Sequence, residues 1–144
     1  MVFLIWKYAI YFVYSNKNVM TRINVAIPVE ELVDRHLLAE AREIKRIPNV
    51  VSRGRYNLKN TPKEFTLGKG HVAFFYNKLL YLKNRYEDIY KECKLRNFNV
   101  SYWGDSWDNV PPHLMNDYIP TKRDENIIRQ RIEERLKTMK IKKK

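Results

Sequence analysis

Residues 70–97 read GHVAFFYNKLLYLKNRYEDIYKECKLRN and carry the longest apolar stripe of the chain. Apolar side chains recur there at steps of three and four residues, which is the spacing of one face of an α-helix. The stripe consists of Val72, Phe75, Leu79, Leu82, Tyr86, Ile89 and Cys93. We therefore expect a helix from about Gly70 to Asn97, with this face buried in the core and without a chemical role of its own.

Two further segments show the same periodicity. One runs from about Glu30 to Val51 and places five apolar residues on one side: Val33, Leu37, Ala41, Ile44 and Ile47. The other begins near Thr121, where Thr121 and Asp124 have the spacing of an N-terminal capping arrangement. We expect this last helix to direct three residues inward: Ile128, Ile132 and Leu136.

The segments between these helices, residues 52–69 and 98–120, hold turn residues and clustered aromatic residues but no strand periodicity of useful length. The chain has 144 residues, which is enough for one domain with a modest core. The predicted fold is therefore all-α: a compact single-domain three-helix bundle with irregular aromatic loops.

The composition points to an acidic partner. The chain has 28 Lys and Arg against 16 Asp and Glu, a formal net charge of +12. Such an excess favours a polyanion such as nucleic acid, although a lysine-rich surface encoded by an AT-rich genome would look similar. The single cysteine, Cys93, excludes an internal disulfide framework and is typical of a reducing compartment. His36, His71 and His113 stand alone in the sequence, so we expect neither a metal site nor a cofactor.

Basic residues line the first helix opposite its apolar side. Arg35, Arg42 and Arg46 follow one another at spacings of seven and four. A solvated charged face is the usual meaning of such a pattern. Few acids accompany the three arginines, however, and this favours contact with phosphates.

Residues 1–19 differ in character from the rest of the chain. The apolar run from Met1 to Tyr14 is interrupted by Lys7 and is shorter than the roughly 20 residues of a membrane-spanning helix. It also lacks the basic-then-apolar order and the small-residue cleavage site of a signal peptide. Three interpretations are open: an upstream extension from a mis-assigned start, a real hydrophobic anchor, or a cleaved segment. We favour the first, with translation beginning at Met20.

A start at Met20 would change the chemistry of the next residue. Removal of Met20 leaves the small residue Thr21 with a free α-amine. An α-amine has a pKa of roughly 7.7–8.0, against about 10.4 for lysine, so far more of it is an unprotonated nucleophile near neutral pH. If the chain begins at Met1, the same nitrogen is an amide without this reactivity.

Four segments, taken in order, resemble the pyrimidine-dimer DNA glycosylases of the phage endonuclease V type. They are MTRIN at residues 20–24, DRHLLAEARE at 34–43 with Arg46 following, FTLGKGHVAFFYNK at 65–78, and DYIP at 117–120. Together they cover most of residues 20–136. We therefore expect an upstream extension at residues 1–19, a glycosylase domain at 20–139 and a basic tail at 140–144.

The resemblance implies a fold in which the amino-terminal segment threads between the first two helices. It also implies two linked activities on double-stranded DNA. The first cleaves the glycosidic bond of the 5′ base in an ultraviolet-induced pyrimidine dimer, and the second is β-elimination at the resulting abasic site. In the implied mechanism the α-amine of Thr21 attacks the sugar and forms an imine, and Glu43 is the essential carboxylate.

The same resemblance implies DNA-binding residues. Arginine suits phosphate because its planar fork can donate two parallel hydrogen bonds. His36 matches the family without an assigned role, and Arg35 replaces a glutamine that is usual near the substrate. The implied protein is an intracellular monomer that acts on DNA without metal, cofactor or membrane. Its expected DNA-binding residues are Arg22, Arg35, Arg42, Arg46 and Arg131.

Two other functions stay open at this point. Without a free amine on Thr21 the protein would be a non-catalytic basic DNA-binding module, and with a genuine hydrophobic leader it would be tethered to a membrane. Two departures from the family concern recognition: the loop between Arg46 and Phe65 is shorter and less basic, and no aromatic segment follows the third helix. We expect abasic-site cleavage to depend less on these segments than dimer recognition does.

Overall fold

The structure, a computed structural model, describes residues 22–142, and side chains up to Met139. Thr21, the expected nucleophile, lies outside the described residues, together with residues 1–20 and 143–144. The described part contains helices and no strand, which confirms the prediction of an all-α fold for these residues. In chain order the elements are η1 (Val29–Glu31), α2 (Asp34–Glu43), α3 (Arg46–Ser52), α4 (His71–Phe74), α5 (Leu79–Leu95), η2 (Gly104–Trp107), η3 (Pro112–Leu114) and α6 (Lys122–Lys142), where η marks a 3-10 helix.

The first expected helix is not continuous. The predicted span from Glu30 to Val51 is divided into η1, α2 and α3, so this prediction was wrong in its extent. Pro48 explains the break between α2 and α3, because proline has no N–H to donate to the carbonyl four residues earlier and its ring clashes with that carbonyl. The chain tightens before it, with Ile47 N–H bonded to Ile44 O at 3.3 Å. Val33, expected inward, precedes α2 in extended conformation and is 39% exposed.

The second expected helix is also divided, into α4 and α5. Phe74 and Phe75 are neighbours in sequence and both are buried. Adjacent positions point about 100° apart on a helix, so a turn after α4 lets both rings enter the core. The Lys78 ammonium donates to Phe74 O at 2.9 Å and thereby satisfies a carbonyl at the end of α4.

The core predicted for this segment is confirmed. Six of the seven stripe residues are buried and Val72 is half-buried. The core also contains Ile23, Val25 and Ile27 from the segment before η1, which carries no helical pattern.

The last helix begins as predicted. Thr121 Oγ1 accepts from the Asp124 amide at 3.1 Å, and Asp124 Oδ2 accepts from the Thr121 amide at 3.0 Å, so the capping arrangement is confirmed. Ile128 is fully buried, and Ile132 packs against the core with partial exposure. The helix continues to Lys142 and so includes the first residues of the segment expected to be a tail.

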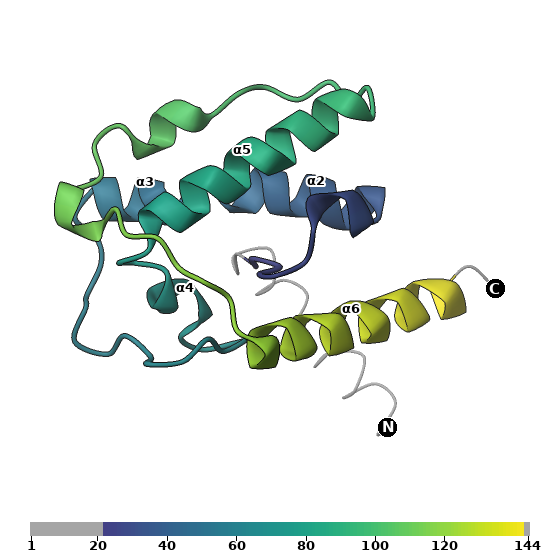
Figure 1. Cartoon of the computed structure of the whole chain (residues 1–144). Coiled ribbons are helices and arrows are strands. Elements are labelled where there is room, and N and C mark those ends of the chain that lie inside the picture. The colour runs from purple at the N-terminus through teal and green to yellow at the C-terminus, as the bar shows by residue number, and fades with distance from the viewer. Residues whose placement is uncertain (1–21, 143–144) are drawn as a thin grey trace, which may run out of the picture.

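The helices surround the amino-terminal segment. In Figure 1, α5 passes in front of α2 and α3, and α6 forms the lower edge of the molecule. The segment after residue 21, drawn in purple, lies between α2 and α6 (Figure 1). No helix within residues 22–142 combines the length and the apolar composition needed to cross a bilayer.

Candidate functional site

Glu43, the expected catalytic carboxylate, is the last residue of α2 and is half-buried. Its Oε2 accepts a hydrogen bond from the backbone N–H of Arg22 at 3.3 Å. Burial raises the pKa of the Glu43 carboxyl, while the Arg22 amide and the charges of Arg46, Arg22 and Arg42 oppose this shift. The structure therefore brings Glu43 to the residue that directly follows Thr21 in the chain.

The next residue along the chain is held by a histidine. The Ile23 N–H donates to Nε2 of His71 at 2.9 Å, and His71 Nδ1 lies 2.8 Å from the carbonyl oxygen of Thr66. Since Nε2 accepts, the proton of the neutral ring is on Nδ1, which donates to Thr66. Burial is the main cause that lowers the pKa of His71 to about 4. Sequence reasoning left His71 without a role.

Asn24 is held by a buried ion pair that the sequence analysis missed. Its Nδ2 donates to Glu40 Oε1 at 2.7 Å, and Arg85 Nη2 donates to the same oxygen at 3.1 Å. Arg85 Nε donates to Glu40 Oε2, and Arg85 Nη1 donates to Ile27 O at 2.9 Å. A usable signal existed: Glu40 and Arg85 each stand three residues after a buried leucine and four before a buried isoleucine, where periodicity predicts an apolar residue.

Positive charges converge on the side chain of Arg22. Burial lowers the pKa of its guanidinium to about 10, with further lowering by Arg131 and Arg135 of α6, and Glu43 acts in the opposite direction. The pKa of Arg131 is also lowered, by burial first and Arg135 second. Like charges this close favour an anion between them, and phosphate is the anion that guanidinium groups hold best.

Arg131 has buried donors available to such an anion. Its Nε and Nη2 atoms are buried and have no hydrogen-bond partner among the described residues. Buried donors in folded proteins are nearly always bonded to protein, water or a ligand, so these two atoms are open to the oxygens of an anion. His36 is subject to the same positive charges. Burial is the main cause that lowers its pKa, and four arginines lower it further: Arg135, Arg35, Arg22 and Arg131. The structure thus brings Arg22 and Arg131 together, from opposite ends of the described chain.

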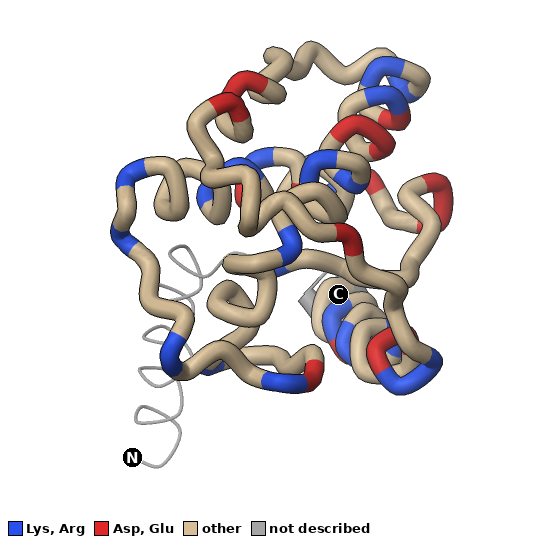
Figure 2. The backbone as a smooth tube through the Cα atoms, turned by 60° about the vertical axis from the view of Figure 1, so that its left-hand side comes forward, with Lys and Arg blue, Asp and Glu red and all other residues tan. Residues whose placement is uncertain are grey.

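The other expected DNA-binding arginines lie on the surface. Arg35 is in the first turn of α2, Arg42 in its last turn, and Arg46 begins α3, and all three are exposed. Basic residues also follow one another along the loop between α3 and α4, where Glu64 is the one acid (Figure 2). Exposed basic residues therefore lie on α2, at the start of α3 and along this loop, and we refer to them as the basic surface.

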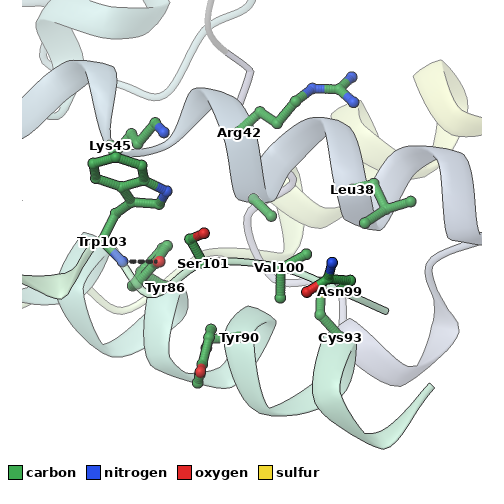
Figure 3. Close-up of a pocket in the computed structure, with 11 residues that line it drawn as sticks. Leu38, Arg42, Lys45, Tyr86, Tyr90, Cys93, Asn99, Val100, Ser101 and Trp103 are labelled. Carbon is green, nitrogen blue, oxygen red and sulfur yellow. Dashed lines mark hydrogen bonds between the residues drawn. The ribbon is translucent and has the colours of Figure 1, made fainter. Parts of the chain in front are cut away.

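A pocket of about 310 Å³ lies between α2, α5 and the segment at residues 99–103 (Figure 3). Arg42 lines it from α2, Lys45 from the residue before α3, and Tyr90 and Cys93 from α5. Trp103 closes one end, with the Lys45 ammonium 4.0 Å from its ring centroid. Apolar walls with a cationic edge suit a flat heteroaromatic ring. The pocket was not predicted from the sequence.

His71 makes stability depend on pH. Its pKa falls from 6.5 to about 4 on folding, so the folded protein needs the neutral ring. The contribution of the neutral His71 ring to the free energy of unfolding is fully present above pH 6.5 and is lost progressively as pH falls towards 4. Its size is on the order of 3 kcal/mol. Urea unfolding at several pH values between 4 and 7 should give a steeper dependence for the natural protein than for His71→Gln. Equal slopes would contradict this assignment.

An all-helical fold, a carboxylate beside the amino-terminal segment and convergent guanidinium groups are features that suit contact with a phosphate-bearing polymer. The model of one protein family, described as pyrimidine dimer DNA glycosylase, matches residues 20–102 of this chain. The match covers more than half of the chain, and the chain belongs to this family. The predicted family is thereby confirmed, and with it the class of activity, that of a pyrimidine dimer DNA glycosylase.

The matched region contains Glu43, His71, the Glu40–Arg85 pair and most of the pocket, and it begins at Met20. It ends before α6, so the case for Arg131 depends on geometry. Among residues 22–142, no group of three or more His, Cys, Asp or Glu side chains has an arrangement that could hold a metal ion.

Proposed function

We propose that this glycosylase also cleaves the DNA strand at the abasic site it creates, and that the α-amine of Thr21 is the nucleophile of both steps. The observation that carries the proposal is the hydrogen bond from the Arg22 amide to Glu43, at 3.3 Å. The α-nitrogen of Thr21 is three covalent bonds from that amide nitrogen, hence no more than about 4 Å away. A free amine at Thr21 would therefore lie close to the carboxylate.

The charges around Arg22 favour the reactive form of such an amine. An α-amine already has a pKa of roughly 7.7–8.0, and neighbouring positive charges disfavour its protonated form. Arg22, Arg131 and Arg135 supply those charges. Burial raises the pKa of Glu43, and this favours the uptake of a proton by its carboxylate.

The chemistry proceeds in two steps. In the first, the nitrogen lone pair of Thr21 forms a bond to C1′ of the damaged nucleotide, and the glycosidic bond breaks with its electron pair leaving on the base. The amine loses a proton to Glu43, which passes it to O4′ as the C1′–O4′ bond breaks and the sugar ring opens to an iminium, while water protonates the departing base. In the second, this iminium acidifies the C2′ proton; its transfer to the Glu43 carboxylate forms a carbon–carbon double bond and expels the 3′ phosphate. Water then hydrolyses the imine and frees the amine.

The basic surface would hold the duplex around this centre. We infer that Arg22 and Arg131 grip phosphates beside the reacting sugar, and that Arg35, Arg42 and Arg46 contact the backbone further out. An enzyme that reaches C1′ within a duplex must open the base stack, at a lower cost where a dimer already distorts pairing. The pocket beside Arg42 gives a displaced base a place to lie.

The domain limits proposed from the sequence agree with this assignment. The described core runs from Ile23 to Ile128, so a chain started at Met20 contains all of it. We propose that residues 20–139 form the working domain and that residues 1–19 are an upstream extension.

A duplex with one cyclobutane pyrimidine dimer at a known position tests the proposed function. The chain started at Met20 should release the 5′ base of the dimer from its sugar and nick the strand there, leaving a 3′ unsaturated aldehyde. The same duplex without the dimer should remain intact. Binding to the damaged duplex without bond cleavage would instead indicate a non-catalytic DNA-binding module.

Arg131→Ala should weaken binding to a duplex that carries a tetrahydrofuran abasic analogue. Each lost phosphate contact lowers the slope of log K against log salt by about 1. Arg129→Ala is the matched control on α6, because Arg129 is paired with Glu31 and Glu125. It is not among the arginines that lower the pKa of Arg22, which are Arg131 and Arg135. Fluorescence anisotropy over a range of salt concentrations gives both slopes. An unchanged slope for Arg131→Ala would remove this residue from the phosphate contacts.

A further inference from the structure

Three consecutive residues at the start of the described chain are each tied to a different partner. The amide of Arg22 is bonded to Glu43, the amide of Ile23 to His71, and the side chain of Asn24 to Glu40. Ile23 is fully buried and Asn24 is 8% exposed, so these ties lie inside the molecule. A segment without helix or strand is therefore tied to side chains of α2 and α4 at three successive residues.

Histidine is well suited to its place in this arrangement. The ring of His71 accepts from one backbone group, Ile23 N–H, and donates to another, Thr66 C=O. A neutral imidazole offers an acceptor and a donor on opposite edges of one rigid plane. The ring is also packed edge-on against Phe65 and Phe75, which fixes its orientation. The position of Ile23 is thus set by a rigid group that is itself held on three sides.

The Glu40–Arg85 pair holds the third of these residues, Asn24. Glu40 is 1% exposed and Arg85 is 9% exposed. Burying such a pair contributes little net stability compared with two apolar residues of similar size, because both charges lose their hydration. What the pair adds is directional bonding: Glu40 accepts a hydrogen bond from the Asn24 side chain, and Arg85 Nη1 donates one to Ile27 O at 2.9 Å. It thereby fixes both ends of the turn that follows Ile23, in which Ala26 has a φ of 65°.

We propose that His71 and the Glu40–Arg85 pair are positioning residues for the reaction. They hold residues 22–24 in the register at which the Arg22 amide meets Glu43, so that Thr21 is covalently joined to a backbone position fixed next to the carboxylate. This inference rests on the proposed imine chemistry. Neither His71 nor the pair touches the substrate; they act through the backbone that they bind. A displacement of about 1 Å in a reacting group costs roughly 10²-fold in rate.

His71→Phe removes both hydrogen bonds and keeps a ring that can pack edge-on against Phe65 and Phe75. His71→Gln restores an acceptor and a donor on one side chain. A second disruption, Asn24→Leu, removes the Asn24 bond while Glu40 keeps both of its bonds from Arg85. Val110→Ala is the control, since Val110 is buried in the core and belongs to none of these ties.

The measurement compares two quantities for each protein started at Met20. One is the single-turnover rate at which the imine forms with an abasic duplex at saturating concentration. It is measured by borohydride trapping over a range of pH. The other is the Kd for a duplex with a tetrahydrofuran site, which cannot form an imine. We expect His71→Phe and Asn24→Leu to slow imine formation about 10- to 100-fold at nearly constant Kd. His71→Gln should recover most of the rate, and Val110→Ala should match the natural protein.

The pH profile separates positioning from general loss of structure. A displaced amine leaves the charges around Arg22, so the pH at which its rate is half-maximal should shift in His71→Phe and Asn24→Leu but not in Val110→Ala. Unchanged rates in both disrupted variants would overturn the inference and leave the imine chemistry intact. Absence of a trapped imine in the natural protein would overturn the proposed function and the inference with it. Where His71→Phe does not fold, Asn24→Leu decides the outcome.

Discussion

Glu43→Gln is expected to slow strand cleavage by at least about 10²-fold while DNA binding changes little. A positioned acid or base contributes typically 10²- to 10⁴-fold. Glutamine keeps an oxygen that can accept the hydrogen bond from the Arg22 amide, so the amino-terminal segment should stay in place. Glutamine has no charge to stabilise a cationic sugar, however, and it takes up no proton. Single-turnover cleavage of an abasic duplex measures the effect, and the Kd for a tetrahydrofuran duplex measures binding.

The pH dependence gives this prediction a second readout. Because burial raises the pKa of Glu43, the natural enzyme should lose activity on the acid side at a higher pH than an ordinary glutamate would give. This acid limb should be missing from the residual activity of Glu43→Gln. Glu133→Gln is the matched control, since Glu133 is exposed on α6 and paired with Lys137. Full activity in Glu43→Gln would show that another group serves as the acid or base.

Blocking the α-nitrogen of Thr21 is expected to have the largest effect of all. In a chain that retains residues 1–20 this nitrogen is an amide, whose lone pair is delocalised into the carbonyl and does not attack carbon. Imine formation and strand cleavage should therefore fall below detection, while binding to a tetrahydrofuran duplex persists. Proteins started at Met1 and at Met20, each checked by mass spectrometry of the intact chain, supply the comparison.

Thr21→Ala completes this test, because alanine keeps the α-amine and removes the hydroxyl. The Thr21→Ala protein should retain cleavage within about 10-fold of the natural chain started at Met20. Loss of activity in Thr21→Ala, with persistence in the chain started at Met1, would assign the nucleophile to the hydroxyl or to another residue.

The core was predictable from periodicity, but the helix ends were not. The residues at three- and four-residue steps on α5 are buried as expected. The breaks arise from local features that a helical wheel does not weigh: Pro48 between α2 and α3, and the adjacent rings of Phe74 and Phe75 after α4. A proline inside a helical pattern ends or kinks the helix near that point, so the first break was visible in the sequence.

The site divides in a similar way. Glu43, Arg22 and Arg131 were expected from family resemblance, and the structure places Arg22 beside both of the others. The buried Glu40–Arg85 pair and the role of His71 were missed, because their partners are up to 58 residues apart or on a segment with no periodic pattern. A charged residue at an apolar helical position is the sequence signal for such a pair, and both Glu40 and Arg85 have it.

Peptide mapping of the borohydride-trapped complex tests the imine chemistry most directly. After reduction on an abasic duplex and digestion of protein and DNA, the sugar remnant should be found on the peptide that begins at Thr21, attached to its backbone nitrogen. Attachment to a lysine side chain, or a protein that cuts damaged DNA with its threonine nitrogen permanently acylated, would contradict the assignment.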